Sequence, residues 1–216
     1  MCMRDLVIIG KGGFARETKW IIDRINDHTN EWNFLGYIDK STDEIDVIGD
    51  DGYILNMKRK LAVVLAIANP AIRNNIYLKY KKNKFLDFPN IIDPSVKMSE
   101  RVCLGKGNII CVGDIMTVDI SIGSFNIIND GCTIGHDVRF GDFNTVNPGS
   151  NISGNVVLKD FVEIGTGVKI IQGITIEEGV IAGAGSVIIS DIPAETTVVG
   201  VPAKIIKYHE QGKQNE

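Results

Sequence analysis

The chain has 216 residues, a length that allows one or two domains. Its 23 Lys and Arg against 27 Asp and Glu give a net charge of −4, which disfavours a nucleic-acid partner, since such proteins normally carry a basic face. No run of about 18 apolar residues occurs, so we expect no membrane-spanning helix and no membrane partner. The segment Met1–Asp5 has no signal-peptide pattern, and we expect a cytoplasmic location.

The first 90 residues alternate between strand-like and helix-like segments. The apolar run Leu6–Ile9 predicts a strand, the glycine-rich turn Gly10–Gly13 follows it, and apolar residues at helical spacing begin at Phe14. A second strand is predicted over residues 34–38 and closes with Asp39 and Lys40. This order of strand, glycine turn, helix and strand indicates a Rossmann-like βαβ domain over residues 1–90.

The same domain continues with a third strand and a second helix. Residues 61–68 are fully apolar, as in a buried parallel strand. Pro70 opens a helix that reaches Tyr80 and ends in the basic run Lys79–Lys84. We interpret that basic run as a solvated helix end.

From residue 91 onward the sequence has a six-residue period. Between residues 92 and 192 there are 19 Ile and 12 Val but only 2 Leu, a preference for β-branched residues that indicates strands. Every sixth residue from Ile92 to Ile188 is apolar. This hexapeptide period predicts an all-β parallel β-helix over residues 91–216, with three six-residue sides and a return every 18 residues.

Residues 18 apart should lie on neighbouring coils, and two such columns support this fold. The first is β-branched throughout and should form an inner corner: Val102, Ile120, Val138, Val156, Ile174 and Ile192. The second is an asparagine ladder in which each amide bonds to the next: Asn108, Asn126 and Asn144. Residues 198–204 leave the period, and we expect a short helix over residues 205–211.

The hexads, the segment Ile134-Gly135-His136-Asp137 and the ending Gly200-Val201-Pro202-Ala203-Lys204 resemble the left-handed β-helix acyltransferases. With the turn Gly10–Ala15 and the segment Tyr37-Ile38-Asp39, nearly the whole chain resembles two related groups. These are the sialic acid O-acetyltransferases of the NeuD type and the PglD-type N-acetyltransferases of nucleotide-linked 4-amino sugars. The resemblance implies a left-handed β-helix that binds acetyl-CoA behind a nucleotide-sugar-binding domain.

The resemblance also implies roles for individual residues. His136 matches the general base and Asp137 its acidic helper. Positions that contact acetyl-CoA in the family correspond to Thr145, Gly154, Thr166 and Ala184. Positions that contact the nucleotide sugar correspond to Gly12, Gly13, Phe14, Asp39, Lys40 and Ala68. This sequence departs from the family's frequent choices at three of them, since the family often has His at positions 14 and 145 and Gly at position 68.

Spacing agrees with this assignment at the catalytic position. Gly154 lies 18 residues after His136, so it should stack beside the imidazole and leave room there. Pro148, Thr166 and Ala184 are also 18 apart and should form a column of compact side chains for an extended pantetheine arm.

The function implied is acetyl transfer from acetyl-CoA to a nucleotide-linked amino sugar, without a metal. One alternative is O-acetylation of sialic acid or another surface-glycan sugar, and another is a non-catalytic β-helix scaffold. A zinc carbonic anhydrase on this fold would need a histidine cluster, whereas His28, His136 and His209 are the only histidines. The resemblance also implies a homotrimer, in which outward apolar residues such as Ile109, Ile115 and Ile127 would be covered.

Overall fold

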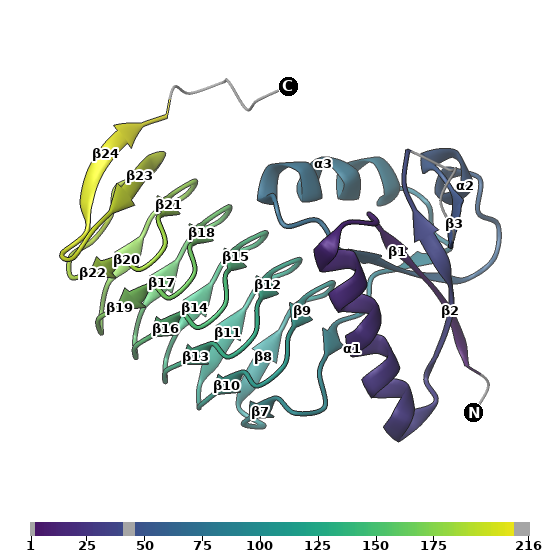
Figure 1. Ribbon diagram of the computed structural model, residues 1–216, viewed down its shortest axis with the longest axis horizontal. Helices are drawn as coiled ribbons and strands as arrows, with labels where there is room; N and C mark the ends of the chain where they lie inside the picture. Colours follow the sequence, from purple (N-terminus) through teal and green to yellow (C-terminus); the bar gives the residue numbers. More distant parts are fainter. Residues whose placement is uncertain (1–2, 41–45, 210–216) are drawn as a thin grey trace.

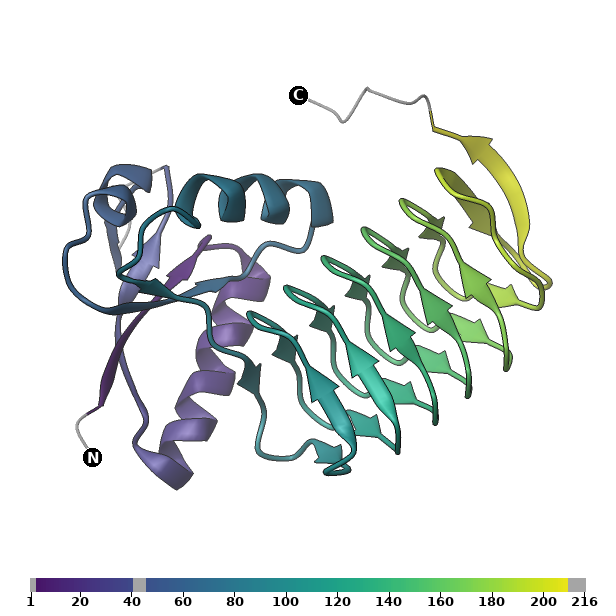
Figure 2. The same cartoon turned by 180° about the vertical axis from the view of Figure 1, so that it is seen from behind.

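The computed structural model describes residues 3–40 and 46–209. Two parts follow each other along the chain: an α/β domain and a long stack of short strands (Figure 1). The α/β domain lies at the first-coil end of the stack, and the C-terminal strands close the other end (Figure 2).

The N-terminal domain is a parallel sheet with helices α1 and α3 on it. Its strands and helices are β1 (Arg4–Ile9), α1 (Gly13–Thr29), β2 (Trp32–Ile38), β3 (Val47–Gly49), α2 (Asp51–Leu55), β4 (Leu61–Leu65), α3 (Pro70–Tyr80) and β5 (Leu86–Asp87). The strand order is β3-β2-β1-β4-β5, and every neighbouring pair is parallel. The chain therefore reverses its direction of growth between β1 and β4, as in doubly wound nucleotide-binding folds.

Local sequence explains most of these elements. All five residues of β4 are buried, as expected for a central parallel strand. Helix α3 has Pro70 in its first turn, and Oδ1 of its N-cap Asn69 accepts a hydrogen bond from the Ile72 amide at 3.0 Å. The expected third strand ends at Leu65 rather than residue 68, because the chain there turns toward α3. Elements α2, β3 and β5 were not predicted.

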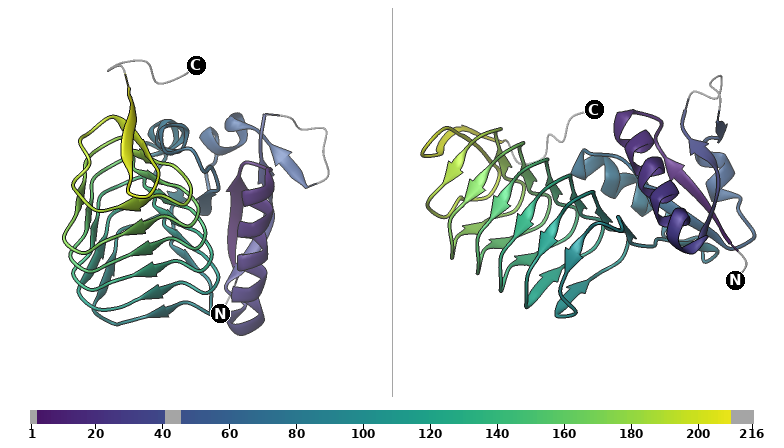
Figure 3. Two further views of the ribbon diagram at one scale, coloured as in Figure 1. Left: turned by 60° about the vertical axis from the view of Figure 1, so that its left-hand side comes forward. Right: turned by 60° about the horizontal axis from the view of Figure 1, so that its bottom comes forward.

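The second part is the predicted β-helix. Its strands are β6 (Ile91–Ile92), β7 (Lys97–Met98), β8 (Val102–Leu104), β9 (Ile109–Ile110), β10 (Ile115–Met116), β11 (Ile120–Ile122), β12 (Ile127–Ile128), β13 (Thr133–Ile134), β14 (Arg139–Phe140), β15 (Thr145–Val146), β16 (Asn151–Ile152), β17 (Val157–Leu158), β18 (Glu163–Ile164), β19 (Lys169–Ile170), β20 (Thr175–Ile176), β21 (Ile181–Ala182), β22 (Val187–Ile188), β23 (Thr196–Val199) and β24 (Lys204–Tyr208). Figure 3 shows the stacked coils from two oblique directions, one with the C-terminal end turned forward and one with the bottom turned forward.

The strands form three sheets, one for each side of the coil. Up to β22, each sheet takes every third strand. Sheet B contains β6, β9, β12, β15, β18, β21, β23 and β24. Sheet C contains β7, β10, β13, β16, β19 and β22, and sheet D contains β8, β11, β14, β17 and β20. Neighbouring strands pair in parallel at a spacing of 18 residues, as Ile109 with Ile127 and Thr133 with Asn151 illustrate. The predicted left-handed β-helix with three sides is confirmed.

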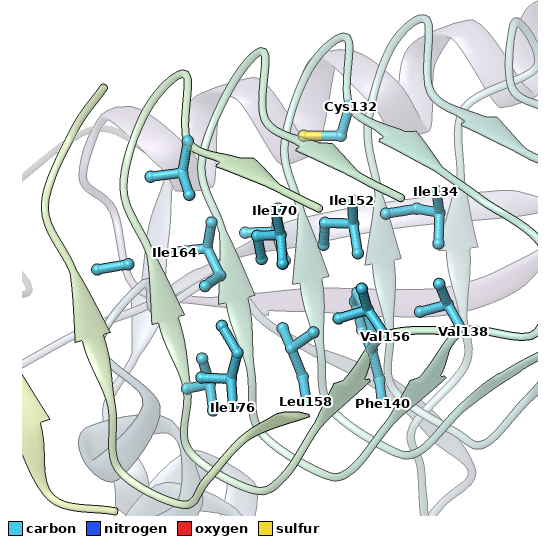
Figure 4. Packing of buried hydrophobic residues seen from close by; sticks show 14 of the residues in the cluster. Cys132, Ile134, Val138, Phe140, Ile152, Val156, Leu158, Ile164, Ile170 and Ile176 are labelled. Atoms are coloured by element: carbon cyan, nitrogen blue, oxygen red, sulfur yellow. The ribbon is translucent and has the colours of Figure 1, made fainter. Parts of the chain in front are cut away.

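The hexad residues fill the interior. From Ile110 to Ile188 every one of them is at most 5% exposed, and their side chains stack coil on coil (Figure 4). Met98, in the first coil, is 39% exposed because its strand β7 is the edge strand of its sheet and has a neighbouring strand on one side only. The predicted inner column also holds, since Ile120, Val138 and Val156 are buried.

The asparagine ladder is present and extends one coil further than predicted. Within the predicted set the side-chain amides bond only between Asn126 and Asn108, because the Asn144 side-chain amide has no hydrogen-bond partner among the described residues. The Asn126 side-chain amide donates to Oδ1 of Asn108 at 3.1 Å, and the Asn144 backbone amide donates to Oδ1 of Asn126 at 2.8 Å. Asn90 adds a fourth member, because its Oδ1 accepts from the Asn108 backbone amide at 2.8 Å. At the other end, Oδ1 of Asn144 accepts from the Val162 amide.

The C-terminal prediction was wrong. Residues 204–208 form strand β24, antiparallel to β23, and not a helix. The turn containing Val201 and Pro202 reverses the chain direction. Residues 204–208 therefore pair with the free edge of β23. The last coil is also two residues short, because Ala182 pairs with Val198 at a spacing of 16. Gln211 lies outside the described residues.

The two domains share a buried contact, and it corrects one expectation. Ile109 and Ile127, both 1% exposed, pack with Ile21 and Ile22 of α1 inside this chain. They are therefore not free to cover a trimer contact, whereas Ile115 remains 41% exposed. No helix in residues 3–40 and 46–209 is long and apolar enough to cross a membrane.

Candidate functional site

His136 lies at the corner between sheets C and D, directly after β13. Its side chain is about half exposed, and Nδ1 lies 2.8 Å from Oδ2 of Asp137. An ionised carboxylate only accepts hydrogen bonds, so Nδ1 carries the proton in this contact. Nε2 then keeps its lone pair and faces outward from the pair. His136 and Asp137, the two residues that the resemblance put forward, are thus hydrogen-bonded in the arrangement that a general base needs.

Gly154 lies against this imidazole on the next coil. A Cβ atom at residue 154 would lie 2.5 Å from Nε2 and 2.5 Å from Cε1 of His136. Any side chain at residue 154 would displace the imidazole ring. The observed position of His136 therefore requires glycine at residue 154. The coils are joined at this corner by a hydrogen bond of 2.7 Å from the Asn155 amide to the His136 carbonyl.

The predicted pantetheine column lies at another corner. Pro148, Thr166 and Ala184 stack between sheets B and C, linked by hydrogen bonds of 2.9 Å from Gly167 to Pro148 and 2.8 Å from Gly185 to Thr166. Thr166 and Ala184 are exposed. Within one chain this corner and the His136 corner lie at opposite edges of sheet C, so the structure does not bring the two groups together in a single subunit.

Thr145 occupies a third position, inside the contact between the two domains. It is 1% exposed, and its hydroxyl donates to the Ala68 carbonyl at 2.7 Å. Its oxygen accepts from Arg73 at 3.1 Å. Because the hydroxyl is used within the chain, the structure places Thr145 away from both the His136 corner and the Thr166 column.

Arg73, in the first turn of α3, was not predicted and holds the domains together. Its guanidinium donates to the carbonyls of Phe125 at 2.8 Å and Phe143 at 3.0 Å on the β-helix. It also donates to the carbonyls of Ile67 at 2.6 Å and Ala68 at 2.9 Å on the loop after β4. The side chain is 1% exposed and has no carboxylate within hydrogen-bond reach among the described residues. Burial lowers the pKa of the Arg73 guanidinium to about 9, and it stays charged at neutral pH.

The glycine turn lies at the point where the sheet reverses direction. Gly10 donates to the Ile38 carbonyl at 2.9 Å, and Ala66 donates to the Ile9 carbonyl at 3.2 Å, so the loops after β1, β2 and β4 meet at one edge. Gly12 is the N-cap of α1 and Gly13 its first residue. The carboxyl edge of a parallel sheet at such a reversal, next to a helix N-terminus, is where these folds bind phosphate-bearing ligands.

Intrachain packing does not explain why positions 12 and 13 are glycines. A Cβ atom at either residue would have no neighbour within 4 Å, and both residues are exposed. Gly10 differs, because its φ of +94° and the Ile67 side chain at 2.8 Å from a built Cβ require glycine there. Open space beside Gly12 and Gly13 is what close approach of a ligand to the backbone needs.

The remaining predicted substrate residues flank this edge. Asp39 and Lys40 follow β2, and Ala68 follows β4. Ala68 is exposed, although its carbonyl accepts hydrogen bonds from Thr145 and Arg73. Phe14 is half buried and packs against the core under α1. Gly12, Gly13, Asp39 and Ala68 are thus brought to one edge of the sheet, whereas Phe14 contributes mainly to packing.

An aromatic column was also missed, although its spacing is visible in the sequence. Phe125, Phe143 and Phe161 are 18 apart, each with φ of 59°, and their rings stack at 5.1 and 5.5 Å. Tyr77 of α3 packs on this column, 4.3 Å from the Phe125 ring. The column therefore docks α3, with Arg73, onto the β-helix. Among the described residues, no group of three or more His, Cys, Asp or Glu side chains is arranged to hold a metal ion.

Comparison with known proteins agrees with this geometry. The PglD N-terminal domain family matches residues 5–80. The structure of PerB from Caulobacter crescentus, in complex with CoA and GDP-perosamine, aligns with a TM-score of 0.88 at 29% identity over 95% of this chain and 99% of that one. The acetyltransferase domain of PglB from Neisseria gonorrhoeae aligns with a TM-score of 0.88 at 28% identity over 94% of this chain and 100% of that one.

WeeI from Acinetobacter baumannii aligns with a TM-score of 0.85 at 27% identity, over 95% of this chain and 100% of that one. The curated protein sequences contain no significant match. A PglD N-terminal domain followed by a β-helix, in a chain that aligns with these acetyltransferases over 94% and 95% of its length, confirms the predicted resemblance. The chain has the fold and domain order of the left-handed β-helix sugar N-acetyltransferases of the hexapeptide-repeat family.

Proposed function

We propose that this protein transfers the acetyl group of acetyl-CoA to the amine of a nucleotide-linked amino sugar. The observation that carries the proposal is the His136 corner, where Nδ1 is held by Asp137 and Nε2 lies over Gly154. The likeness to PerB, whose structure contains CoA and GDP-perosamine, supports the same reaction class. An N-linked product is favoured over the O-acetylation alternative because PerB is a perosamine N-acetyltransferase.

The reaction is a direct transfer. The sugar amine attacks the thioester carbonyl and forms the new C–N bond while Nε2 of His136 takes a proton from the nitrogen. Asp137 stabilises the imidazolium that results. Collapse of the tetrahedral intermediate breaks the C–S bond, and the imidazolium returns the proton to the leaving CoA thiolate. We assign the donor to the oxyanion to a backbone amide near Gly154.

Acetyl-CoA is proposed to bind along the β-helix at a seam between subunits. The compact column of Pro148, Thr166 and Ala184, of which Thr166 and Ala184 are exposed, supports a place for the extended pantetheine. His136 and this column lie at opposite edges of sheet C, so one acetyl-CoA molecule reaches both only when the column belongs to a neighbouring subunit. We therefore propose a homotrimer, supported by apolar residues left exposed around sheet C: Ile115, Val118, Ile171 and Ile189.

The nucleotide part of the acceptor is proposed to bind at the reversal point of the N-terminal sheet. The unexplained glycines Gly12 and Gly13 and the free amides of the first turn of α1 support a site for its phosphates. We assign the base or ribose to Asp39 and Lys40, which follow β2. We further propose a cytoplasmic location, which suits the free thiols of Cys103, Cys111 and Cys132.

The test is a thiol-release assay with acetyl-CoA and a panel of nucleotide-linked 4-amino sugars, GDP-perosamine among them. We expect release of CoA thiol that depends on an acceptor amine, with the matching 4-hydroxy sugars as controls. A protein that binds acetyl-CoA but releases thiol with no member of either panel would support the scaffold alternative. Release with the hydroxy sugars alone would replace N-transfer by O-transfer.

A further inference from the structure

The N-terminal domain carries a segment whose charge is opposite to that of the chain. Residues 52–86 contain eight Lys and Arg and no Asp or Glu, whereas the other residues contain 15 Lys and Arg against 27 Asp and Glu. The segment is thus +8 and the remainder −12. The net charge of −4 conceals this asymmetry, and our expectation of no membrane partner rested only on the absence of a long apolar run.

The fold gathers most of these cations at one end of the domain, where α2 and α3 both end (Figure 1). One hollow of 530 Å³ is lined by Lys58, Lys79, Lys82 and Lys84, and Lys84 also lines a second hollow that reaches Lys60. We name this surface, made of Lys58, Lys60, Lys79, Lys81, Lys82 and Lys84, the basic end. Arg73 is not part of it, because it is buried at the other end of α3.

Most of these ammonium groups have no counter-ion. Lys79 pairs with Asp51 at 3.2 Å, but no carboxylate among residues 3–40 and 46–209 lies within 4.0 Å of Lys58, Lys60, Lys81, Lys82 or Lys84. Like charges so close together repel one another, and an anionic partner would relieve that repulsion. The basic end is also distant from the His136 corner, which belongs to the β-helix, so the proposed reaction does not use it.

Two leucines stand among these lysines with their side chains in solvent. Leu55, at the end of α2, is 50% exposed and lines the first hollow, and Leu78 in the last turns of α3 is 43% exposed. We propose that the basic end binds the surface of an anionic phospholipid membrane, with the lysines on the headgroups and Leu55 and Leu78 at the acyl boundary.

The composition favours a lipid surface over other polyanions. Six lysines offer mobile, strongly hydrated charges, whereas nucleic-acid sites rely on arginine forks and on exposed aromatic rings that stack with bases. Arg59, between Lys58 and Lys60, is paired with Asp5, and Phe85, which lines both hollows, is half buried with the Lys84 ammonium 5.6 Å from its ring centre. Exposed aliphatic side chains among lysines are typical of segments that lie at the membrane interface. A protein partner would instead be expected to find aromatic or arginine anchors at the centre of the surface.

The test is co-sedimentation of the full chain with vesicles of equal parts phosphatidylglycerol and phosphatidylcholine, and with vesicles of phosphatidylcholine alone. We expect binding to the anionic vesicles only, weakened by salt. The triple variant Lys58→Gln, Lys82→Gln, Lys84→Gln should bind roughly 100-fold more weakly, because each lysine contributes about fivefold near an anionic surface. The matched control Lys159→Gln, Lys204→Gln, Lys207→Gln removes the same charge from exposed lysines of the β-helix and should bind as the wild type does.

A second variant separates a membrane from a soluble polyanion. Leu55→Ser with Leu78→Ser should weaken vesicle binding severalfold and leave the salt dependence in place. Acetyl transfer to a soluble acceptor should be unchanged in all of these variants, which also shows that they are folded. The proposal is overturned if the wild type does not sediment with anionic vesicles at low salt, or if the control triple variant loses as much binding. It is equally overturned if duplex DNA binds as tightly as the vesicles and the leucine variant is unaffected.

Discussion

At the residue scale, an 18-residue period predicts which side chains are neighbours along one corner of the β-helix. It does not predict which residues from outside the repeat contact them. Gly154 was predicted beside His136 from that spacing, and the structure places it there. Thr145, nine residues after His136, is half a coil away and therefore on another side of the β-helix. Its partners, Ala68 and Arg73, come from more than 70 residues earlier in the chain, and no periodicity within the repeat points to them.

The first residue-scale prediction concerns the proposed base. His136→Ala should lower kcat by about 10²- to 10⁴-fold, because general-base catalysis contributes that factor. The KM for acetyl-CoA should change far less, since the imidazole touches only the reacting end. Asp137→Asn should reduce kcat by a smaller factor, because Asp137 acts through the imidazole.

The pH profile of the same variant tests the kind of acceptor. An amine acceptor arrives increasingly deprotonated at high pH, so the activity of His136→Ala should rise with pH. A hydroxyl acceptor stays protonated throughout and gives no such rescue. A folded His136→Ala protein with a wild-type kcat at neutral pH would remove His136 from the mechanism.

Thr145 gives a second prediction at this scale. Thr145→Val leaves the Arg73 guanidinium and the Ala68 carbonyl each one partner short in a buried contact. The free energy of unfolding should fall by about 2 kcal/mol, the usual effect of stranding buried polar groups. Thr145→Ser keeps the hydroxyl and should lose less than half of that. The KM for acetyl-CoA should be the same in both variants, and a raised KM with unchanged stability would restore Thr145 to the acetyl-CoA site.

At the scale of elements, the β-helix was predictable because each coil repeats the same requirements. An inward apolar residue every six positions and a column member every 18 define strands, sheets and register together. The exceptions lie where the repeat stops: the shortened last coil, strand β24, and Asn90, which precedes the first repeat residue. In the N-terminal domain, by contrast, β3 and α2 are too short to show a period.

The asparagine ladder permits a prediction about an interior corner. Asn126 is fully buried, and its amide donates to Asn108 and to the Gly141 carbonyl at 3.0 Å while its carbonyl accepts from Asn144. Asn126→Ala should lower the free energy of unfolding by about 2–4 kcal/mol, because several buried groups lose their partners at once. Asn33→Ala, which removes one exposed hydrogen bond to Asp5, should cost under about 1 kcal/mol. Equal effects of the two substitutions in denaturant titrations would contradict a structural role for the ladder.

Asp114, in the turn before β10, makes stability depend on pH. It is fully buried, Oδ1 accepts from the Cys132 amide at 2.7 Å, and Oδ2 has no partner in the described structure. Burial raises the pKa of the Asp114 carboxyl to about 8. The folded protein therefore holds a proton that the unfolded chain, with a pKa of about 3.9, releases. The contribution of protonated Asp114 to the free energy of unfolding is complete below pH 4. It is lost as the pH rises from 4 to 8, by up to about 1.4 kcal/mol per pH unit.

Asp114→Asn mimics the protonated carboxyl and removes this dependence. Thermal unfolding should show the variant more stable than the wild type at pH 8 and about equal to it at pH 4. Asp119→Asn, at an exposed residue of the same coil, is the control and should leave the slope of stability with pH unchanged. A wild-type protein whose stability rises between pH 5 and pH 8 while Asp114→Asn does not would reverse the sign and contradict the assignment.

At the scale of the whole molecule, outward apolar residues in a repeat show only that something covers them. Sequence reasoning assigned Ile109 and Ile127 to a trimer contact, but α1 of the same chain covers both. The covering element depends on how the two domains dock, and that docking uses contacts that no repeat specifies, such as the ion pair between Arg24 and Asp93 at 2.6 Å and the hydrogen bonds of Arg73. Among the apolar residues that stay exposed, Ile115, Val118, Ile171 and Ile189 lie around sheet C, which is the surface we propose for other subunits.

The proposed trimer with shared active sites predicts complementation between two inactive variants. His136→Ala lacks the base, and Thr166→Trp should block the pantetheine column while leaving the coil intact, because Thr166 is exposed. We propose that each site takes His136 from one subunit and Thr166 from its neighbour. A site is then intact when the Thr166→Trp chain supplies His136 and the neighbouring His136→Ala chain supplies Thr166. Random mixing of equal amounts into closed threefold rings makes about one quarter of the seams intact. Co-refolding the two variants should therefore restore about a quarter of the wild-type activity, whereas refolding each alone restores none.

If the mixed preparation stays inactive although light scattering shows mixed trimers, both residues serve a site within one subunit. A stable monomer at micromolar concentration would contradict the assembly itself.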